Sequence, residues 1–332
     1  MKRTPYFLRY VGAALAFFLV VWLGIFAYTT QNPGTSAAYW KVRIALVGAE
    51  RAYGELAVSI AGMPLIVQHR RAHRFGEALY AREGVDGAVV CDKRFFYGCF
   101  HQLIGEAIAE HGVAVASDLA AVCARALPDV SACFHSIGHG LLNFFGYDEE
   151  SLNDALQACR TLNDPKAFCS SGVFMEYVLR TMLQPETEAL PIESGGRHAV
   201  CDSLSNLSSR ERLWCIFWLP TWWAANHVSY PAQGLECRRY RAEELSTCIE
   251  GIGKMTVFDA KPSPDFTGRA CRSATRSQQE YVSCVSAAAY ELAFSGYDEA
   301  ASDMCTLLSV SEEWSLCAQY AAKERMAPRV DR

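Results

Sequence analysis

Fourteen cysteines, arranged as seven close pairs, constrain this 332-residue chain more than any other feature. The two members of a pair are 8 to 14 residues apart, and first members recur every 32 to 42 residues. A period of about 35 residues is typical of proteins with one helical hairpin per repeat. The pairs are Cys91 and Cys99, Cys123 and Cys133, Cys159 and Cys169, Cys201 and Cys215, Cys237 and Cys248, Cys271 and Cys284, Cys305 and Cys317.

Residues typical of helix starts stand just before the second cysteine of several pairs. Ser-x-x-Glu capping boxes begin at Ser208, Ser277 and Ser309, and Asp164 is followed by Pro165. Ser, Asp and Glu side chains accept hydrogen bonds from the free N–H groups of a first helical turn, and proline has no N–H group to leave unpaired there. We therefore expect the first cysteine to end one helix and the second to begin the next, so that a local disulfide staples each hairpin. Bridges that cross between repeats are the alternative.

This arrangement resembles the cysteine-rich secreted bacterial relatives of tetratricopeptide repeats, which also carry one bridge per helical hairpin. The resemblance spans Cys91 to Cys317, although the signature Gly, Ala and Tyr positions are not matched and most cysteine separations are wider. It implies an all-α array of about seven disulfide-stapled helical hairpins, either an α/α solenoid or a closed helical array. It implies no activity.

The N-terminal region predicts a membrane anchor. The stretch Tyr10–Tyr28 has no charged residue and follows three basic residues. A helix of this length can cross a bilayer, with the basic flank on the cytoplasmic side. We expect residues 1–30 to form a cytoplasmic stub and a transmembrane signal-anchor, and residues 31–332 a periplasmic or extracellular helical domain, where disulfides persist. A signal peptide cleaved near Ala37 is the alternative.

Charge and fold class limit the partners. The net charge of −5 argues against a nucleic-acid partner, which requires a basic surface. The expected partners are the membrane, through the N-terminal helix, and a peptide or protein on the concave face of the array.

Five of the 8 histidines stand in three short segments within or just before the first repeats. Histidines four residues apart share one face of a helix, which is how helical metal sites present two nitrogens to one ion. His101 and His135 both stand two residues after the second cysteine of a pair. The candidate metal ligands are His69, His73, Glu77, His101, His135 and His139.

Imidazole nitrogen with a carboxylate oxygen suits zinc, iron or copper, so a divalent transition metal is the expected cofactor. Such a site can also be catalytic, by polarising a substrate or activating water. Two alternatives remain: a metal-free acid–base site, and a non-catalytic binding scaffold whose histidines only fill its interior. Motifs for haem attachment, phosphate binding and hydrolase nucleophiles are absent from the sequence.

Further residues near the candidate ligands have structural interpretations. A glycine follows each histidine segment, which predicts close approach of a neighbouring helix or a ligand, because glycine costs a helix about 1 kcal/mol relative to alanine. Glu106, Glu176 and Glu291 each lie seven residues after a cysteine, and we expect them to bond to the preceding helix rather than to a metal. The stripe that contains Trp214 and Trp218 is expected in the core or along an apolar groove.

Overall fold

The computed structural model describes residues 10–12, 14–22, 24, 36–126, 131–164, 166–182, 189–192, 196–259 and 263–322. These residues form helices and no β-strand, which confirms the all-α class. The α-helices are α2 (Ala37–Val47), α3 (Ala49–Ile60), α4 (Leu65–Glu83), α5 (Gly98–His111), α6 (Ala116–Ala126), α7 (Ser131–Phe145), α8 (Glu149–Arg160), α9 (Phe168–Leu179), α10 (Ala199–Asp202), α11 (Ser209–Ala225), α12 (Tyr230–Cys237), α13 (Ala242–Asp259), α14 (Pro264–Ala274), α15 (Gln278–Phe294), α16 (Asp298–Cys305) and α17 (Ser311–Ala322). Short 3-10 helices are η1 (Gly84–Val90), η2 (Arg94–Tyr97) and η3 (Val113–Val115).

Disulfides join consecutive helices in the expected local pattern. Six of the seven expected bridges lie within the described residues. In the seventh pair, Cys133 is disulfide-bonded, but the side chain of its expected partner, Cys123, lies outside the described residues. Local bridges shorten the loops that remain free in the unfolded chain and so stabilise each helix pair. The described residues contain the expected pairs Cys91–Cys99, Cys159–Cys169, Cys201–Cys215, Cys237–Cys248, Cys271–Cys284 and Cys305–Cys317.

Two of the predicted capping residues, Ser208 and Ser277, act as the sequence indicates, whereas α17 begins at Ser311 and no cap bond of Ser309 is found among the described residues. Ser208 and Glu211 form a complete capping box at the start of α11, in which each side chain bonds to the other residue's backbone N–H. The Ser277 side chain accepts a hydrogen bond from the backbone of Glu280 at the start of α15. These two caps fix where α11 and α15 begin, and with them the positions of Cys215 and Cys284.

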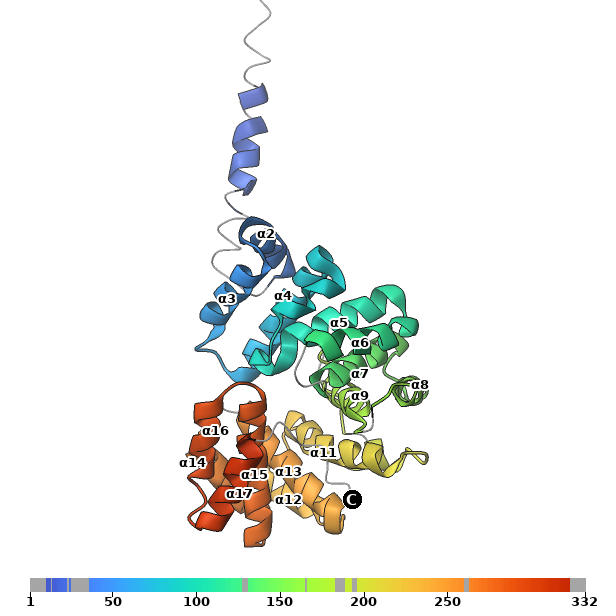
Figure 1. Ribbon diagram of the computed structural model, residues 1–332, viewed down its shortest axis with the longest axis vertical. Helices are drawn as coiled ribbons and strands as arrows, with labels where there is room; N and C mark the ends of the chain where they lie inside the picture. The colour runs from blue at the N-terminus through green and yellow to red at the C-terminus, as the bar shows by residue number, and fades with distance from the viewer. Residues whose placement is uncertain are drawn as a thin grey trace, which may run out of the picture.

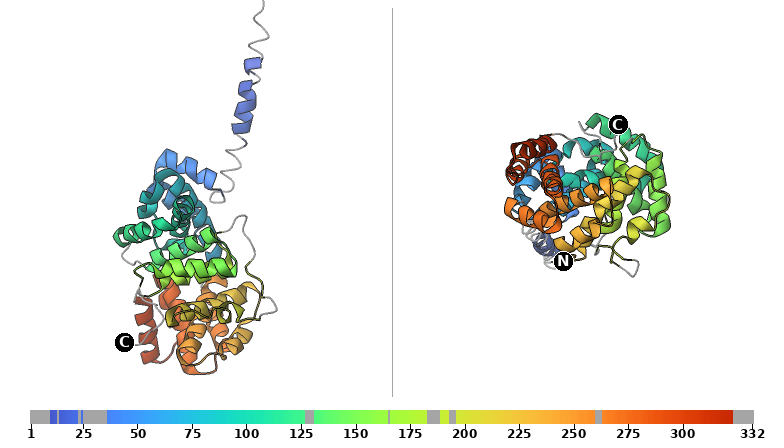
Figure 2. Two further views of the ribbon diagram at one scale, coloured as in Figure 1. Left: turned by 90° about the vertical axis from the view of Figure 1, so that its right-hand side faces the viewer. Right: turned by 90° about the horizontal axis from the view of Figure 1, so that it is seen from below.

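The helices that carry the second cysteines pack in chain order, from α5 through α7, α9, α11, α13 and α15 to α17, and α4 packs on α5 ahead of them. Helix α4 also contacts α13, so the early part of the chain meets the late part. The Tyr297 hydroxyl donates to Gln68 at 3.0 Å, and Lys93 Nζ donates to the carbonyl oxygen of Ala293 at 3.3 Å. In Figure 1 and the left view of Figure 2, the late helices accordingly lie below the early ones.

Glycines set the spacing of the helices that carry the histidines. A Cβ atom added to Gly138 would lie 2.0 Å from the carbonyl oxygen of Cys169 on the neighbouring helix. One added to Gly76 would lie 2.2 Å from the carbonyl oxygen of Cys99. Both positions are therefore too close for any side chain, which confirms the close approach that the glycines predict.

The expected membrane span, Tyr10–Tyr28, falls partly outside the described residues. Within the part of the chain that is described, no helix combines the length and apolar character needed to cross a bilayer. The described apolar side chains of this segment are exposed, among them Leu15 at 65%, Phe18 at 69% and Trp22 at 60%.

Candidate metal centre

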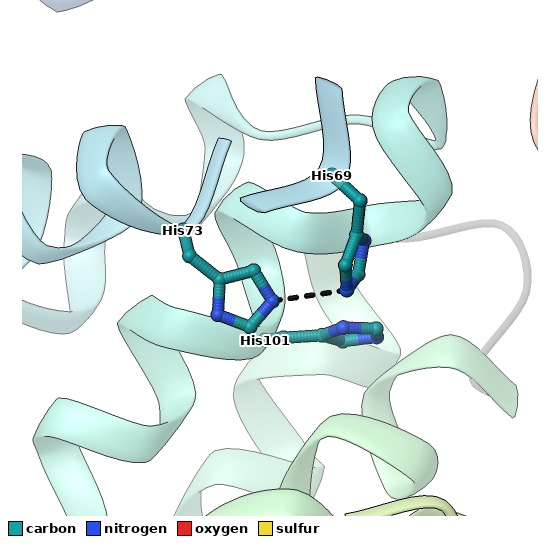
Figure 3. Close-up of side chains that lie close together, drawn as sticks. All are labelled: His69, His73 and His101. Carbon is teal, nitrogen blue, oxygen red and sulfur yellow. Dashed lines mark hydrogen bonds between the residues drawn. The ribbon is translucent and has the colours of Figure 1, made fainter. Parts of the chain in front are cut away.

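Three neighbouring helices bring the five predicted histidines together. His69 and His73 lie on α4, His101 on α5, and His135 and His139 on α7. The ring centroids of His69 and His73 are 4.6 Å apart, and those of His135 and His139 are 4.8 Å apart. The His101 ring lies between the two pairs, 5.3 Å from His69 and 4.7 Å from His139. Figure 3 shows the rings of His69 and His73 turned toward each other beside His101.

The first pair has a defined tautomer. His69 Nδ1 lies 2.8 Å from the carbonyl oxygen of Phe95, which can only accept, so Nδ1 carries the proton. His73 Nδ1 lies 3.0 Å from Oε1 of Gln102. The amide of Gln102 is held in this orientation because its Nε2 donates to Glu106 at 2.7 Å. In the neutral rings, each Nε2 atom therefore carries no proton and has an unshared lone pair.

These two lone pairs face each other. His69 Nε2 and His73 Nε2 are 3.0 Å apart inside the protein, where no proton is left to join them. Two nitrogens bound to one ion at about 2.1 Å lie about 3.0 Å apart at a right angle and about 3.4 Å apart at a tetrahedral angle. The pair thus already has the spacing of two ligands of a single cation.

The carbonyl that orients His69 comes from a strained segment. Phe95, Phe96 and Tyr97 all have positive φ angles, of 59°, 52° and 57°. Bulky residues rarely adopt this conformation, which costs about 1–3 kcal/mol each and is found mainly at functional sites. The bridge between Cys91 and Cys99 encloses the segment and holds it against α4 and α5.

The second pair is oriented by a buried carboxylate. His139 Nδ1 lies 2.9 Å from Oε2 of Glu176, so Nδ1 donates and Nε2 is free to act as a ligand. His139 Nε2 lies 3.1 Å from His135 Nε2. Glu176 is fully buried and also accepts hydrogen bonds from the Tyr147 hydroxyl, from Thr181 and from the backbone N–H of Met182. This network fixes the carboxylate, and through it the His139 ring.

Burial keeps four of the five histidines neutral. Desolvation lowers the pKa of His69 to about 4 and holds the pKa of His73, His101 and His135 well below the ordinary value. The Nδ1 atom of His101 is buried and has no hydrogen-bond partner among the described residues. Neutral imidazole is the form that binds a metal.

Glu77 is not brought to this cluster. Its carboxylate lies 3.9 Å from Lys41 Nζ and 3.7 Å from Arg74, at a partly exposed position. Each four-residue step advances the side chain by about 40° around a helix, so Glu77 lies about 80° from His69. The i, i+4, i+8 pattern therefore turns the third residue away from the site.

A pocket opens beside the second pair. Its lining includes His101, His135, Trp218, Lys254 and Glu291, with further aromatic side chains. Lys254 is 4% exposed, and its Nζ lies 3.0 Å from the ring centroid of Trp218. Desolvation lowers the pKa of Lys254 to about 8 and raises that of Glu291. The pocket thus combines apolar walls with two ionisable groups and two imidazoles, as small-molecule sites do.

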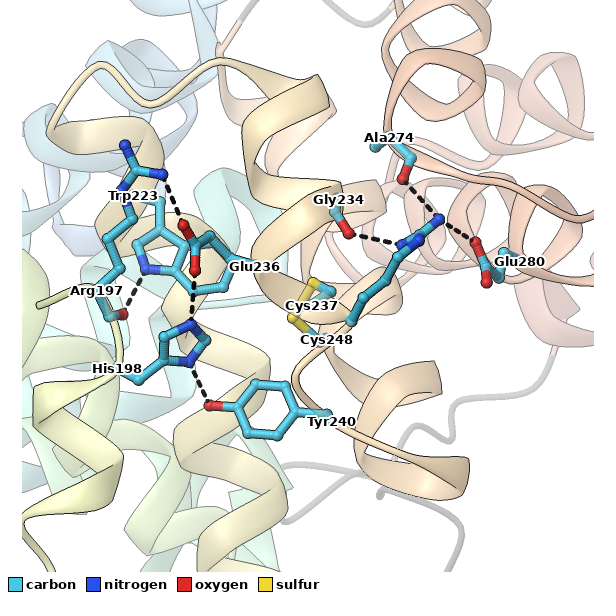
Figure 4. The surroundings of a disulfide bond; sticks show 11 residues. Arg197, His198, Trp223, Gly234, Glu236, Cys237, Tyr240, Cys248, Ala274 and Glu280 are labelled. Carbon is cyan, nitrogen blue, oxygen red and sulfur yellow. Dashed lines mark hydrogen bonds and ion pairs between the residues drawn. A yellow bond between two sulfur atoms is a disulfide. The ribbon is translucent and has the colours of Figure 1, made fainter.

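His198 shows what a purely structural histidine looks like in this fold. Its Nδ1 lies 2.8 Å from the hydroxyl of Tyr240, and its Nε2 lies 3.0 Å from Glu236, next to the bridge between Cys237 and Cys248 (Figure 4). Both nitrogens therefore have partners, and no lone pair is left over. The His69–His73 pair differs in this respect.

Comparison with protein-family models, curated proteins and solved structures gave no match. The site is therefore interpreted from its own geometry. Sequence reasoning missed Gln102, Lys254 and the carbonyl of Phe95. It also expected Glu176 to bond to the preceding helix, α8, which was wrong, because the carboxylate bonds to His139 on α7. The equal spacing of Glu106 and Glu176 from their cysteines was the one available signal, since both acids turn out to support histidines, Glu106 through Gln102.

Proposed function

We propose that this protein binds a divalent transition metal through its buried histidines. The observation that carries the proposal is the pair of Nε2 lone pairs of His69 and His73, 3.0 Å apart with both Nδ1 protons committed elsewhere. Two facing acceptors in a dry interior repel each other, and a cation between them removes the repulsion. Nitrogen ligands of this kind suit zinc, iron or copper.

Metal analysis of the purified full chain tests this proposal. We expect bound zinc, iron or copper in the wild-type protein and a loss of metal in His73→Ala, with the disulfides and helix content retained. His198→Ala is the matched control, because it removes an equally buried histidine with both nitrogens already partnered. A metal-free wild-type protein that also fails to take up added zinc or copper would overturn the proposal.

The pocket beside His135 supports a catalytic use of the metal. An ion held by three histidines keeps open positions for water or a substrate, as in catalytic zinc sites. His135 and His101 line the pocket, and Lys254 supplies a cation opposite them. We propose that a small molecule binds there and meets the metal. Turnover of a substrate that is abolished both by chelation and by Lys254→Met would support this.

We also propose that the stapled helices form a closed array of hairpin repeats, exported and anchored through the N-terminal segment. The disulfides are typical of an oxidising compartment, and the contacts of α4 with α13 support closure. Protease added to intact cells or spheroplasts should digest the helical domain. Protection of that domain would contradict export.

A second candidate function rests on a separate groove between α13, α15 and α17. The groove has a volume of about 540 Å³ and is lined by Glu243, Glu250 and Glu280 together with several serines. Ser286 is among the lining residues, and its hydroxyl is buried without a hydrogen-bond partner among the described residues. These features favour a basic peptide as ligand, which a binding titration against lysine-rich and glutamate-rich peptides of equal length would test.

A further inference from the structure

We infer that the histidine cluster holds two metal ions, one at each histidine pair, with His101 shared between them. This inference rests on the proposed metal-binding function and adds its stoichiometry. The described side chains form two groups of three whose ligand nitrogens all lie within 4.8 Å of one another. The first group is His69, His73 and His101, and the second is His101, His135 and His139.

One ion cannot bind all five histidines in this arrangement. Two ligands of the same ion are separated by at most twice the bond length, about 4.2 Å for nitrogen on zinc. The described residues form no group of four or five histidines even within 4.8 Å. The two pairs therefore lie too far apart to share an ion, while each pair alone has its nitrogens at the spacing of two ligands, 3.0 Å and 3.1 Å.

Each pair also has its own supporting bonds. His69 and His73 are held by Phe95 and Gln102, whereas His139 is held by Glu176, which comes from α9. Partners of this kind fix the tautomer and orientation of metal-bound imidazoles. A single site would need only one such set. Two independent sets of partners, Phe95 with Gln102 and Glu176 on α9, fit two sites.

His101 fits the shared position. It lies on α5, which packs against α4 on one side and α7 on the other. Its ring is 3% exposed, and its Nδ1 has no hydrogen-bond partner among the described residues. An imidazole has two nitrogens, and one of them carries a proton in the neutral ring. When His101 releases this proton to solvent as the ions bind, each nitrogen is a ligand for one ion. With His101 included, each ion receives three nitrogens from the chain.

The two ions would differ in access. His69 is fully buried and His73 is 5% exposed, so the first site is closed to solvent. His135 is only partly buried and lines the pocket with Lys254. The second ion would therefore be the one that meets a small molecule, while the first would be held away from it.

Titration of the metal-free full chain with Co²⁺, followed by visible absorption and by elemental analysis after desalting, tests the stoichiometry. We expect two ions per chain in the wild type and in His198→Ala. His73→Ala and His139→Ala should each bind one ion, and His101→Ala should weaken both sites. The intact mass with all disulfides formed, together with circular dichroism, checks that each variant folds.

The outcomes separate the two claims. A result of two ions per wild-type chain supports the inference, and this result can be interpreted without the variants. One ion per chain overturns it but leaves the proposed function standing. No bound ion overturns both. If His73→Ala and His139→Ala each abolish all binding although they fold, the histidines form one site and the inference is wrong.

Discussion

The substitution Lys254→Met should stabilise the metal-free protein, and the gain should shrink as pH rises. Lys254 is 4% exposed and packs its Nζ against Trp218, and no ion pair to it is found among the described residues. Desolvation lowers its pKa from 10.5 to about 8. Lys254 therefore binds its proton less tightly in the folded state than in the unfolded state. The protonated, buried lysine destabilises the fold by this difference.

The magnitude follows from the size of the pKa shift. At about 1.4 kcal/mol per pKa unit, the penalty is about 3 kcal/mol at neutral pH. The penalty is fully present below the folded pKa of about 8. It is lost as pH rises toward the unfolded value, so that about 1.4 kcal/mol remains near pH 9.5. The advantage of Lys254→Met over wild type should therefore fall by about 2 kcal/mol between pH 7 and pH 9.5.

Urea unfolding with the disulfides intact and a chelator present measures this difference. Any effect of methionine packing is independent of pH, so only the change with pH reports on the lysine. Glu291 faces the same pocket, and the comparison should be repeated in a Glu291→Gln background to remove its coupling to Lys254. A difference that stays constant from pH 7 to pH 9.5 would show that the lysine is not desolvated as described.

Three further predictions concern the helix contacts, the carboxylate and the bridges. Gly138→Ala should lower the melting temperature, with a loss of about 3 kcal/mol, because its Cβ would meet the Cys169 carbonyl oxygen at 2.0 Å. Gly54→Ala, in open space on α3, is the control and should be neutral or stabilising by up to about 1 kcal/mol. Glu176→Ala should destabilise the fold by about 3–5 kcal/mol in thermal unfolding and release metal from the second pair first, because it leaves several buried donors unpaired. Reduction of the disulfides should lower the urea midpoint, and unchanged stability after complete reduction would contradict the stapling role.

Local features of the fold were predictable from the sequence. The pairing of the cysteines and the start of α11 at Ser208 depend on residues within about one helical hairpin of each other, where spacing and capping rules apply. The meeting of the histidine pairs was also predictable, because His101 and His135 occupy the same position in neighbouring repeats.

The remaining parts of the site depend on contacts that the sequence pattern does not encode. Lys254 reaches the pocket only because α13 comes back to the early helices. The carbonyl of Phe95 is presented by positive φ angles at three aromatic residues, for which no composition signal exists. Glu77 lies apart from the histidines because a straight helix rotates the third residue of an i, i+4, i+8 series away from the first, which spacing alone does not show.

The contact between early and late helices has a consequence for biogenesis. All five histidines lie on α4, α5 and α7, which are synthesised before α13 and α15. The wall of the pocket that carries Lys254 and Glu291 arrives last. Under the proposed metal-binding function, an ion would enter the half-built domain through a side that later becomes protein interior. Loading would then be tied to the moment of synthesis, and an ion lost from the finished protein would be replaced slowly. A chain that stops before α13 would keep the five histidines but lack the pocket wall that carries Lys254 and Glu291.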